Sequence, residues 1–408
     1  MNRLLQINIT ANWGSHGKIA EGIGLAAMRL GWESHIAYGR WKNPSRSQLY
    51  PIGSSIDENI HGISSRIFDN HGLMSHIATH NLIRYINKIG PDIIHLHNIH
   101  GYYLNYPILF AFLTKSNIPV VWTLHDCWPY TGHCSHYMFA NCNKWKTHCR
   151  QCPLKKNYPR SIFADRSYKN FEQKRQAFLS LANLTLVPVS KWLEGELRQS
   201  FFKDSNIRQI YNGIDVETFR RTDNPTIREK YDIANSKKVV LGIASNWYRK
   251  GLEDFVRLRS ALDDEYEIVL VGVRKDDAKR LPHGIRGIQR TEDTEDLKAL
   301  YSTADVYFNP TWEDNFPTTI LESLACGTPV VTYNTGGCRE AIRPETGRII
   351  ERGDLPKAVE AISLLCSQGK ETYSLYCRNS VLTHFQQKSQ YEEYIKLYSE
   401  LISTPSAP

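Results

Sequence analysis

Short apolar runs alternate with helical patterns through the first half of the chain. The runs that predict strands are rich in Leu, Ile and Val, and they cover residues 4–9, 35–38, 92–97, 120–125 and 184–189. The helical patterns between them cover residues 18–30, 81–89, 106–115, 168–181 and 192–201. Strands that alternate with helices in this way predict a parallel, doubly wound sheet.

The same alternation begins again after "IYNGIDVETF". Strands are predicted at 238–244, 267–272, 286–289, 306–309 and 330–333, and helices at 252–262, 295–301, 318–325 and 357–366. We therefore expect two Rossmann-like domains, 1–214 and 215–385, facing a cleft. The amphipathic segment 386–402 predicts a last helix that packs back toward the first domain. Ligands of such sheets bind at the carboxyl ends of the strands.

Composition agrees with an ordinary soluble protein of two domains. A chain of 408 residues exceeds what a single core usually supports. The hydrophobic content of 41% and charged content of 23% are typical of globular proteins. No apolar run approaches the ~18–20 residues that span a bilayer. The apolar part of "MNRLLQINIT" is too short for a secretory signal, so a cytoplasmic protein is expected.

The net charge of +8 favours anionic partners, and part of it is concentrated in one insertion, residues 127–160. No acidic residue occurs between Asp126 and Asp165, whereas this stretch carries six Lys and Arg residues among several Trp and Tyr residues. Such a basic, aromatic segment is suited to a membrane interface or an anionic acceptor. The alternative is a solvated loop whose charge bias has no function.

Five of the nine cysteines also lie in this segment or at its edge. Four of them are candidate ligands of a structural zinc ion: Cys134, Cys142, Cys149 and Cys152. A disulfide framework is not expected in a reducing cytoplasm. Unligated thiols and a labile disulfide remain the alternatives.

The segment "DNFPTTILESLACGTPVV" places two carboxylates eight positions apart around a helix start. The Thr318 and Thr319 amides, at the predicted N-terminus, could hold a phosphate, and Asn315 lies in the loop that leads to them. Glu322 could then reach sugar hydroxyls beside that phosphate. Alternatively, Asp314 caps the helix and Glu322 is a solvated charge.

Two strand ends in the first half carry further candidates. "TLHDCW" places His125 and Asp126 after an apolar strand, where a doubly wound fold keeps its active site. "HLHNIHG" places His97 and His100 after the preceding strand, where acceptor hydroxyls could be recognised. For any single histidine, a structural role in the core is the alternative.

Two strand-to-helix loops have the composition of phosphate sites. In "NWGSHGKIAEGIG", Gly14 and Gly17 permit a close approach of the backbone to a ligand, although tight-turn glycines explain them equally well. In "SNWYRKGLEDF", Arg249 and Lys250 precede a helix start, where two cations and the helix dipole can neutralise a diphosphate. A basic helix start near solvent is the alternative.

These motifs together resemble the retaining GT-B glycosyltransferases of glycosyltransferase family 4, especially the bacterial members that build capsule, O-antigen or exopolysaccharide. The resemblance covers nearly the whole chain through these stretches: "GSHGKIAEGI", "PDIIHLHNIHGYYLN", "VVWTLHDCWPYTGHC", "NCNKWKTHCRQCP", "VPVSKWL", "YNGIDVETF", "RKGLEDF" and "DNFPTTILESLACGTPVV". The last of these is the most specific.

The resemblance implies roles for the donor residues. Glu322 is similar to the second acid of the E-x7-E motif, which holds the nucleotide ribose, and Asp314 occupies the position of the first acid, near the donor sugar. Lys250 matches the diphosphate-binding lysine. The arginine usually found five residues earlier is replaced by Ser245, and Arg249 would compensate for it.

The resemblance also implies a reaction. His125 resembles the histidine beside the anomeric carbon, and Gly14 and Gly17 resemble the glycine loop that faces donor and acceptor. A sugar would pass from a UDP- or GDP-sugar to a hydroxyl of a lipid-linked saccharide, with retention of configuration and without a catalytic metal. The protein is expected to work in the cytoplasm, in peripheral contact with the inner membrane, and not to bind nucleic acid.

Two other functions are alternatives to sugar transfer. A nucleotide-sugar epimerase can share the two-domain fold, but it would need acid and base residues on both sides of the sugar and no acceptor groove. A non-enzymatic module that binds sugar or nucleic acid could use the cysteines as a zinc knuckle, but no aromatic motif of the RNA-binding type is present.

Overall fold

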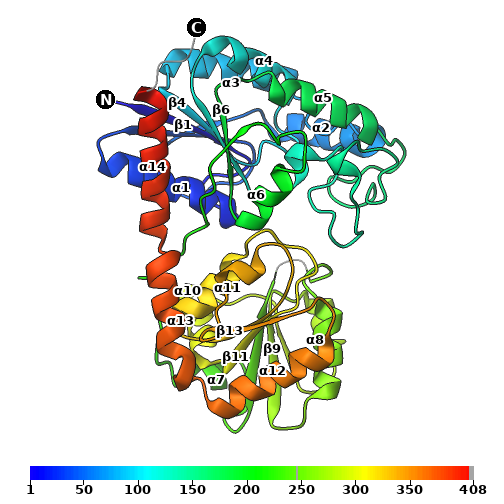
Figure 1. Ribbon diagram of the computed structural model, residues 1–408, viewed down its shortest axis with the longest axis vertical. Helices are drawn as coiled ribbons and strands as arrows, with labels where there is room; N and C mark the ends of the chain where they lie inside the picture. The colour runs from blue at the N-terminus through cyan, green and yellow to red at the C-terminus, as the bar shows by residue number, and fades with distance from the viewer. Residues whose placement is uncertain (245–246, 404–408) are drawn as a thin grey trace. The chain divides into compact units, whose positions relative to one another are not determined.

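Seven parallel strands form the sheet of the first structural unit in this computed structural model, which describes residues 1–244 and 247–403. The unit consists of Met1–Tyr211 together with the chain from Gln390 on, and Asn212–Ser389 form a second unit. The second unit contains a parallel sheet of six strands (Figure 1). The predicted pair of doubly wound domains is confirmed. Ser245 lies outside the described residues.

The first sheet has the strand order β3-β2-β1-β4-β5-β6-β7. Its strands are β1 (Arg3–Asn8), β2 (Glu33–Tyr38), β3 (Gln48–Pro51), β4 (Ile93–Leu96), β5 (Val120–Leu124), β6 (Leu184–Pro188) and β7 (Asn206–Ile207). Leu4 pairs with Ser34 on β2 and with Ile93 on β4, so β1 is central. The order reverses between β1 and β4, and ligands bind at such a switch point in open α/β sheets.

The helices of the first unit are α1 (Gly14–Arg29), α2 (Ser55–Phe68), α3 (His76–Ile89), α4 (Tyr106–Ser116), α5 (Ser167–Leu179) and α6 (Lys191–Leu197). Local signals fix several of their ends. The Asn105 side chain accepts a hydrogen bond from Ile108 N and caps α4, and Ser190 caps α6 through Leu193 N. The insertion between β5 and α5 contains only two short 3-10 helices, Trp128–Tyr130 and Lys144–Lys146.

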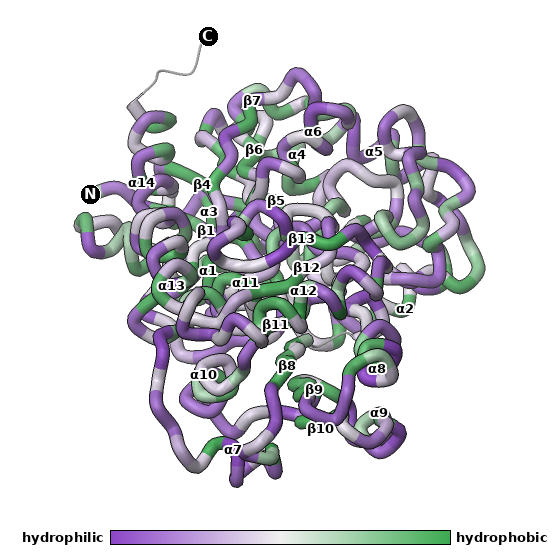
Figure 2. The backbone as a smooth tube through the Cα atoms, turned by 60° about the horizontal axis from the view of Figure 1, so that its bottom comes forward, coloured by the Kyte–Doolittle hydropathy of each residue, from purple (hydrophilic) through white to green (hydrophobic). Residues whose placement is uncertain are grey.

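The second sheet has the strand order β10-β9-β8-β11-β12-β13. Its strands are β8 (Lys238–Ile243), β9 (Tyr266–Val271), β10 (Ile285–Ile288), β11 (Val306–Asn309), β12 (Val330–Tyr333) and β13 (Gly347–Ile350). Helices cover both faces: α7 (Ile227–Lys230), α8 (Leu252–Ala261), α9 (Lys275–Ala278), α10 (Thr294–Thr303), α11 (Thr318–Ala325), α12 (Leu355–Gln368) and α13 (Glu371–His384). Figure 2 shows β8 and β9 as largely hydrophobic, as expected of strands covered on both faces.

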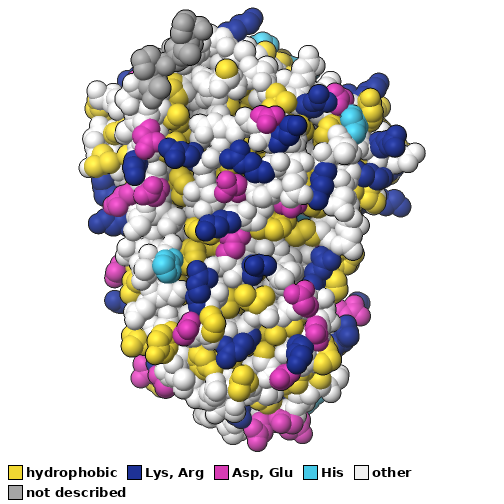
Figure 3. Space-filling model, viewed as in Figure 1, with side chains coloured by type: hydrophobic (Ala, Val, Ile, Leu, Met, Phe, Trp, Pro, Cys, Tyr) yellow, Lys and Arg dark blue, Asp and Glu magenta, His cyan; other side chains and the backbone are white. Residues whose placement is uncertain are grey.

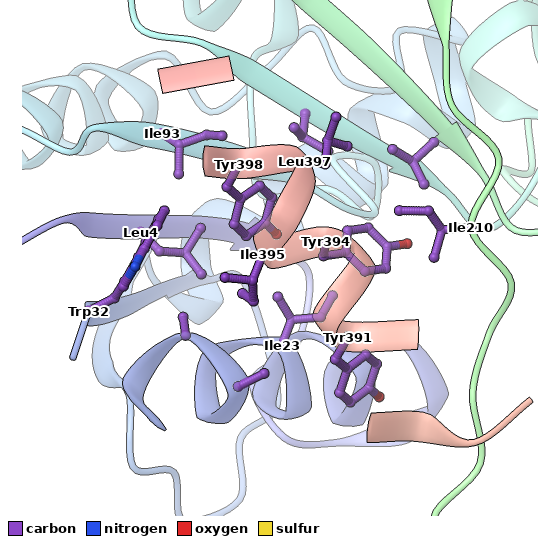
Figure 4. Close-up of a cluster of buried hydrophobic side chains, with 14 of the residues drawn as sticks. Leu4, Ile23, Trp32, Ile93, Ile210, Tyr391, Tyr394, Ile395, Leu397 and Tyr398 are labelled. Atoms are coloured by element: carbon purple, nitrogen blue, oxygen red, sulfur yellow. The ribbon is translucent and has the colours of Figure 1, made fainter. Parts of the chain in front are cut away.

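The last helix, α14 (Gln387–Ser403), packs its apolar face into the core of the first unit. Tyr394, Ile395 and Tyr398 lie among Leu4, Ile23 and other side chains of β1, α1 and β4 (Figure 4). Two tyrosine hydroxyls also make polar contacts inside this core. Thr123 Oγ1 donates to Tyr394 Oη at 3.0 Å, and Tyr398 Oη lies 2.6 Å from His95 Nδ1. The C-terminal helix is therefore fixed to the strands whose ends carry the candidate site.

The structure contains elements that the sequence pattern did not predict. Strand β3, strand β7 and strand β13 are short edge strands, which carry a weak periodic signal. Helix α2 was also not predicted. Its buried positions are His61, Gly62 and Ser65, while its isoleucines are exposed, so its pattern is the reverse of the usual amphipathic helix.

Candidate functional site

The predicted donor residues of the second unit lie in helix α11 and in two loops that contact each other at the carboxyl ends of β8 and β11. Trp312 N donates to Arg249 O at 2.8 Å, and an Arg249 guanidinium nitrogen donates to Glu313 O at 3.3 Å. Trp312 is itself held by a 2.7 Å bond from its indole nitrogen to Asp254 Oδ2 on α8. The loop that follows β8 and the loop that follows β11 therefore form one supported structure.

Gly251 permits this close approach. Its φ of +81° lies in the left-handed region, and a Cβ at this position would meet Pro310 O at 2.3 Å. Any other residue would be strained and would push the two loops apart. Gly251 directly follows Lys250 and precedes α8, so it forms the turn between the lysine and this helix.

Lys250 and Asp314 form an ion pair, and each side chain is 17% exposed. Asp314 Oδ1 also accepts a hydrogen bond from Asn315 N at 2.9 Å. Helix α11 instead begins after Pro317 and has no side-chain cap. The alternative in which Asp314 caps this helix is therefore wrong, and the carboxylate is fixed beside the cation.

Glu322 lies in the middle of α11 and accepts a 2.9 Å hydrogen bond from the Tyr301 hydroxyl. Burial and then the neighbouring Glu322 raise the pKa of Tyr301 well above its usual value, so the hydroxyl keeps its proton and donates. Glu322 is consequently oriented by a buried tyrosine and is not a freely solvated charge. Sequence reasoning did not select Tyr301, because nothing local connects it with the helix that carries Glu322.

Asp314 and Glu322 lie close to a common neighbour, Tyr307 on β11. Burial raises the pKa of Tyr307, a hydrogen bond with Thr319 lowers it, and both carboxylates raise it further. The structure thus brings together Lys250, Asp314 and Glu322 at one edge of the sheet. Arg249 and Asn315 lie in the same loops, and Thr318 and Thr319 begin α11, so this edge offers two cations and two acids to a polar ligand.

In the first unit, two side-chain pairs lie at the carboxyl ends of β4 and β5, and each pair contains a histidine from the end of β4. His97 Nδ1 lies 3.2 Å from His125 Nε2, and His97 Nε2 lies 3.0 Å from Gln6 Oε1 on β1. Burial, followed by the neighbouring histidines, lowers the pKa values of His97 and His125 well below the usual value. Both imidazoles are therefore neutral at physiological pH.

The second pair consists of His100 and Asp126, whose Nε2 and Oδ2 atoms are 2.7 Å apart. The other ring nitrogen of His100 lies 3.0 Å from the Tyr158 hydroxyl, and Trp128 N donates to Asp126 Oδ1 at 2.9 Å. Burial raises the pKa of Asp126, but the charge and hydrogen bond of His100 outweigh it and leave the pKa below its usual range. This carboxylate is therefore ionised and holds the imidazole.

Tyr158 connects the insertion to this pair, and sequence reasoning did not select it as a site residue. Its ring also lies 6.3 Å from Tyr102 and 5.8 Å from His71. An aromatic residue in a basic loop is a weak signal, because only the fold brings residues 100 and 158 together.

The glycine loop precedes and begins α1. Gly14 has a φ of +66°, and a Cβ on Gly17 would meet Thr10 Oγ1 at 2.5 Å. His16, between them, has its ring 6.0 Å from that of His125. Burial lowers the pKa of His16 to about 4. His16 thus brings the start of α1 near the end of β5, while Gly17 permits close packing against Thr10. His95, in contrast, is a core residue that contacts Thr123 and Tyr398.

The four candidate zinc ligands line one small cavity in the insertion, together with His133 and Trp145. All four are free thiols. A hydrogen bond from Cys134 lowers the pKa of Cys152 to about 7, despite burial. Within residues 1–244 and 247–403, however, no group of three or more His, Cys, Asp or Glu residues is placed to hold a metal ion. The zinc ion stays a prediction, to be checked by the zinc content of the purified protein.

Two family models together match most of the chain. The model described as "Glycosyltransferase Family 4" matches residues 20–218, and the model described as "Glycosyl transferases group 1" matches residues 237–368. The first match contains the histidine strand ends, and the second contains Lys250, Asp314 and Glu322. The two models therefore divide the chain as the two structural units do.

Curated relatives agree with these models. WcaC of Escherichia coli (strain K12), assigned as a colanic acid biosynthesis glycosyl transferase, is 26% identical over 98% of this chain and 100% of its own length. An N,N'-diacetylbacillosaminyl-diphospho-undecaprenol alpha-1,3-N-acetylgalactosaminyltransferase of Campylobacter jejuni is 29% identical over 41% of this chain and 46% of its own length.

Solved structures share the fold at low sequence identity. Sucrose-phosphate synthase from Thermosynechococcus elongatus covers 99% of this chain and 100% of its own with a TM-score of 0.74 and 17% identity. The Anabaena protein Alr3699/HepE, solved with UDP-glucose, covers 97% of this chain and 99% of its own with a TM-score of 0.64 and 12% identity.

Proposed function

Because the chain belongs to glycosyltransferase family 4 and has the GT-B fold, we propose that it transfers a sugar from a nucleotide diphosphate to a hydroxyl of a lipid-linked saccharide, with retention of anomeric configuration. The observation that carries this proposal is the assembly of Lys250, Asp314 and Glu322 at the carboxyl edge of the second sheet. The product would be a bacterial surface polysaccharide of the capsule, O-antigen or exopolysaccharide type.

The second unit would bind the donor. Lys250 and Arg249 would neutralise the diphosphate as it leaves, with help from the N-terminus of α11 at Thr318. Glu322, oriented by Tyr301, would accept hydrogen bonds from ribose hydroxyls. Asp314 pairs with Lys250 in the free protein, so a diphosphate would compete for the lysine and leave Asp314 available to the sugar. These charged side chains would serve in place of a metal ion.

The first unit would bind the acceptor and would place His125 beside the reacting carbon. His125 and His97 are neutral, so they place no charge beside the anomeric carbon. His97 contacts Gln6 and His125 through its two ring nitrogens, so it would position His125, which would contact the sugar. Asp126 and the Tyr158 hydroxyl contact the two ring nitrogens of His100, so an acceptor hydroxyl would take the place of the Tyr158 hydroxyl on this ring. The proton of that hydroxyl would pass to the departing phosphate. Gly14 and Gly17 would let the chain approach both substrates.

The donor base and the acceptor are supported in general terms. Alr3699/HepE is named as a complex with UDP-glucose, and the Campylobacter relative is named for a diphospho-undecaprenol substrate. We therefore favour UDP over GDP and a polyprenyl-diphosphate saccharide as the acceptor class. Such an acceptor would be met at the cytoplasmic face of the inner membrane.

A donor screen tests the proposal. Purified protein would be incubated with UDP- and GDP-sugars and a polyprenyl-diphosphate saccharide, and products would be read by mass spectrometry. We expect one donor to add a single sugar, with UDP raising the thermal unfolding temperature more than GDP. An epimerase would change the donor sugar without acceptor, and a binding module would release no nucleotide; either result would contradict the proposal.

A further inference from the structure

Helix α2 presents a row of four isoleucines to solvent. Ile56, Ile60, Ile63 and Ile67 are 69, 54, 58 and 36% exposed. At 100° per residue these positions fall within an arc of about 60° on one side of the helix. Phe68, 56% exposed at the C-terminal end, lies about 80° outside this arc. Single exposed hydrophobic residues are common on proteins, but an aligned row along one helix indicates an interaction site.

Polar contacts on the opposite side fix the helix in this orientation. His61 is fully buried, with Nδ1 2.8 Å from Ser75 Oγ, and its Nε2 accepts a hydrogen bond from Gly72 N at 3.0 Å. A capping box between Ser54 and Asp57 fixes the N-terminal end. Turning the isoleucines inward would break the bonds of a buried histidine, so the apolar row must face outward.

The end of the insertion extends the same apolar surface. Ile162 N donates to Arg66 O at 2.7 Å, and Ala164 N donates to Ile67 O at 3.2 Å, so this strand of chain lies against the end of α2. Figure 1 shows α2 beside the irregular segment. Ile162 is 44% exposed and Phe163 is 74% exposed. We call the set the α2 apolar face: Ile56, Ile60, Ile63, Ile67, Phe68, Ile162 and Phe163.

Cations flank the α2 apolar face. Arg66, Lys156 and Arg160 are exposed, and Lys155 Nζ donates to Phe163 O at 3.1 Å. The two acids of α2 are already engaged: Asp57 belongs to the capping box and Glu58 pairs with Arg40. Figure 3 shows Lys and Arg side chains gathered at the right edge of the first unit, where Figure 1 draws the insertion.

We propose that the α2 apolar face docks on the surface of a lipid bilayer that contains anionic lipids. Aliphatic and aromatic side chains on one side of an interfacial helix enter the acyl boundary, while neighbouring Lys and Arg residues contact lipid phosphates. A second copy of the chain fits less well, because a two-fold contact through this face would bring together two surfaces that carry the same excess of cations.

Aromatic contacts lead from the docking helix to the acceptor residues. The rings of His61 and Tyr102 are 5.8 Å apart, those of Tyr102 and Tyr158 are 6.3 Å apart, and the Tyr158 hydroxyl lies 3.0 Å from His100. These contacts begin at His61, on the side of α2 opposite to the isoleucines, so docking would place this helix between the lipid surface and the acceptor residues. The docking surface itself does not depend on the proposed sugar transfer.

Vesicle co-sedimentation of the full chain, without donor or acceptor, tests the inference. We expect the protein to bind vesicles of phosphatidylethanolamine and phosphatidylglycerol, to bind phosphatidylcholine vesicles less, and to bind less at high salt. The double substitution Ile60→Gln and Ile63→Gln should weaken binding about tenfold or more. Lys156→Gln with Arg160→Gln should reduce the preference for the anionic vesicles.

Leu375→Gln is the matched control, because Leu375 is 68% exposed on α13 of the second unit. It should leave binding unchanged, and all variants should keep the unfolding temperature of the parent protein. The inference is overturned if the parent protein stays in the supernatant with every vesicle. It is also overturned if Leu375→Gln weakens binding equally, or if the parent is a dimer that the α2 variant dissociates.

Discussion

Lys250 and Asp314 neutralise each other across two loops that begin on neighbouring strands. Both side chains are largely shielded from water, and the pair occupies the end of β11 beside the start of α11. A cation already held by a carboxylate is positioned before a ligand arrives, so little reorganisation is needed when a diphosphate replaces the carboxylate. This relationship connects the fold of the second unit to its proposed chemistry.

Replacement of Lys250 should remove a cation that stabilises the departing diphosphate. We expect Lys250→Ala to reduce sugar transfer by at least ~10²-fold, the scale of losing a charged contact in the transition state. Lys230→Ala is the matched control, because Lys230 pairs with Asp296 at 2.8 Å in the same unit but lies on α7. Initial rates with saturating acceptor would measure both. Unchanged turnover in Lys250→Ala would remove this residue from the site.

Replacement of Glu322 should act mainly on nucleotide binding. We expect Glu322→Ala to reduce transfer by at least ~10²-fold and to weaken UDP binding measured by calorimetry, because ribose hydroxyls lose their acceptor. Tyr301→Phe, which removes only the hydroxyl that orients Glu322, should have a smaller effect in the same direction. Equal UDP affinity in the parent protein and in the two variants would show that Glu322 does not contact the nucleotide.

The His100–Asp126 pair should contribute to turnover. A second buried pair, His133–Asp69, has the same 2.7 Å separation but should contribute only to stability. We expect Asp126→Asn to lower transfer at least about tenfold, because His100 loses the charge that holds its ring. Asp69→Asn should lower the unfolding temperature and leave the turnover of the folded enzyme unchanged. Transfer rates and thermal unfolding would be measured for both; similar kinetics in the two variants would contradict the assignment.

Gly251→Ala should destabilise the second unit by about 3 kcal/mol, since it combines left-handed strain with a contact against a backbone carbonyl. Gly90→Ala provides the comparison: Gly90 has a φ of +54°, and its nearest neighbour is an Arg3 side-chain atom at 4.0 Å. Strain alone should cost about 1–2 kcal/mol there. Urea unfolding would measure both, and equal losses would mean that the loop at Pro310 can move away.

Mild acid should destabilise the first unit selectively. In His133 the bond with Asp69 outweighs burial and raises the pKa. Burial lowers the pKa values of seven other histidines of this unit: His16 (about 4), His35, His61 (about 3), His71, His95, His97 and His125. Below about pH 6.5 the unfolded chain binds protons that the folded unit does not. Its free energy of unfolding should therefore fall by about 1.4 kcal/mol per pH unit for each of these histidines, until the pH passes the folded pKa values.

Calorimetry at pH 7 and pH 5 would measure this effect. The second unit is the internal control, because both of its histidines, His283 and His384, are exposed. We expect the unfolding transition of the first unit to move to lower temperature by much more than that of the second. Equal shifts of both transitions would show that the buried imidazoles do not control acid stability.

The periodicity of the sequence was sufficient to predict the two parallel sheets and most of their strands. Strands β11 and β12 and helix α11 have the predicted bounds, because turn residues such as Pro310 and Pro329 delimit these short apolar runs. The strand-end positions of His125, Asp126 and Lys250 followed from the same pattern. None of the described helices is long and apolar enough to cross a membrane, and hydropathy along the chain had already given this result.

Only the tertiary structure decided which polar side chains meet. Tyr301 reaches Glu322 and Tyr158 reaches His100 over 21 and 58 positions of the chain, and no local pattern encodes such contacts. The direction in which α2 faces was also decided by tertiary packing, which buries and hydrogen-bonds His61 on one side and leaves four isoleucines exposed on the other. The sequence by itself therefore determined the sheets and the strand ends, since short-range periodicity specifies them. Long-range packing determined the partners of each site residue and the face left open to a membrane.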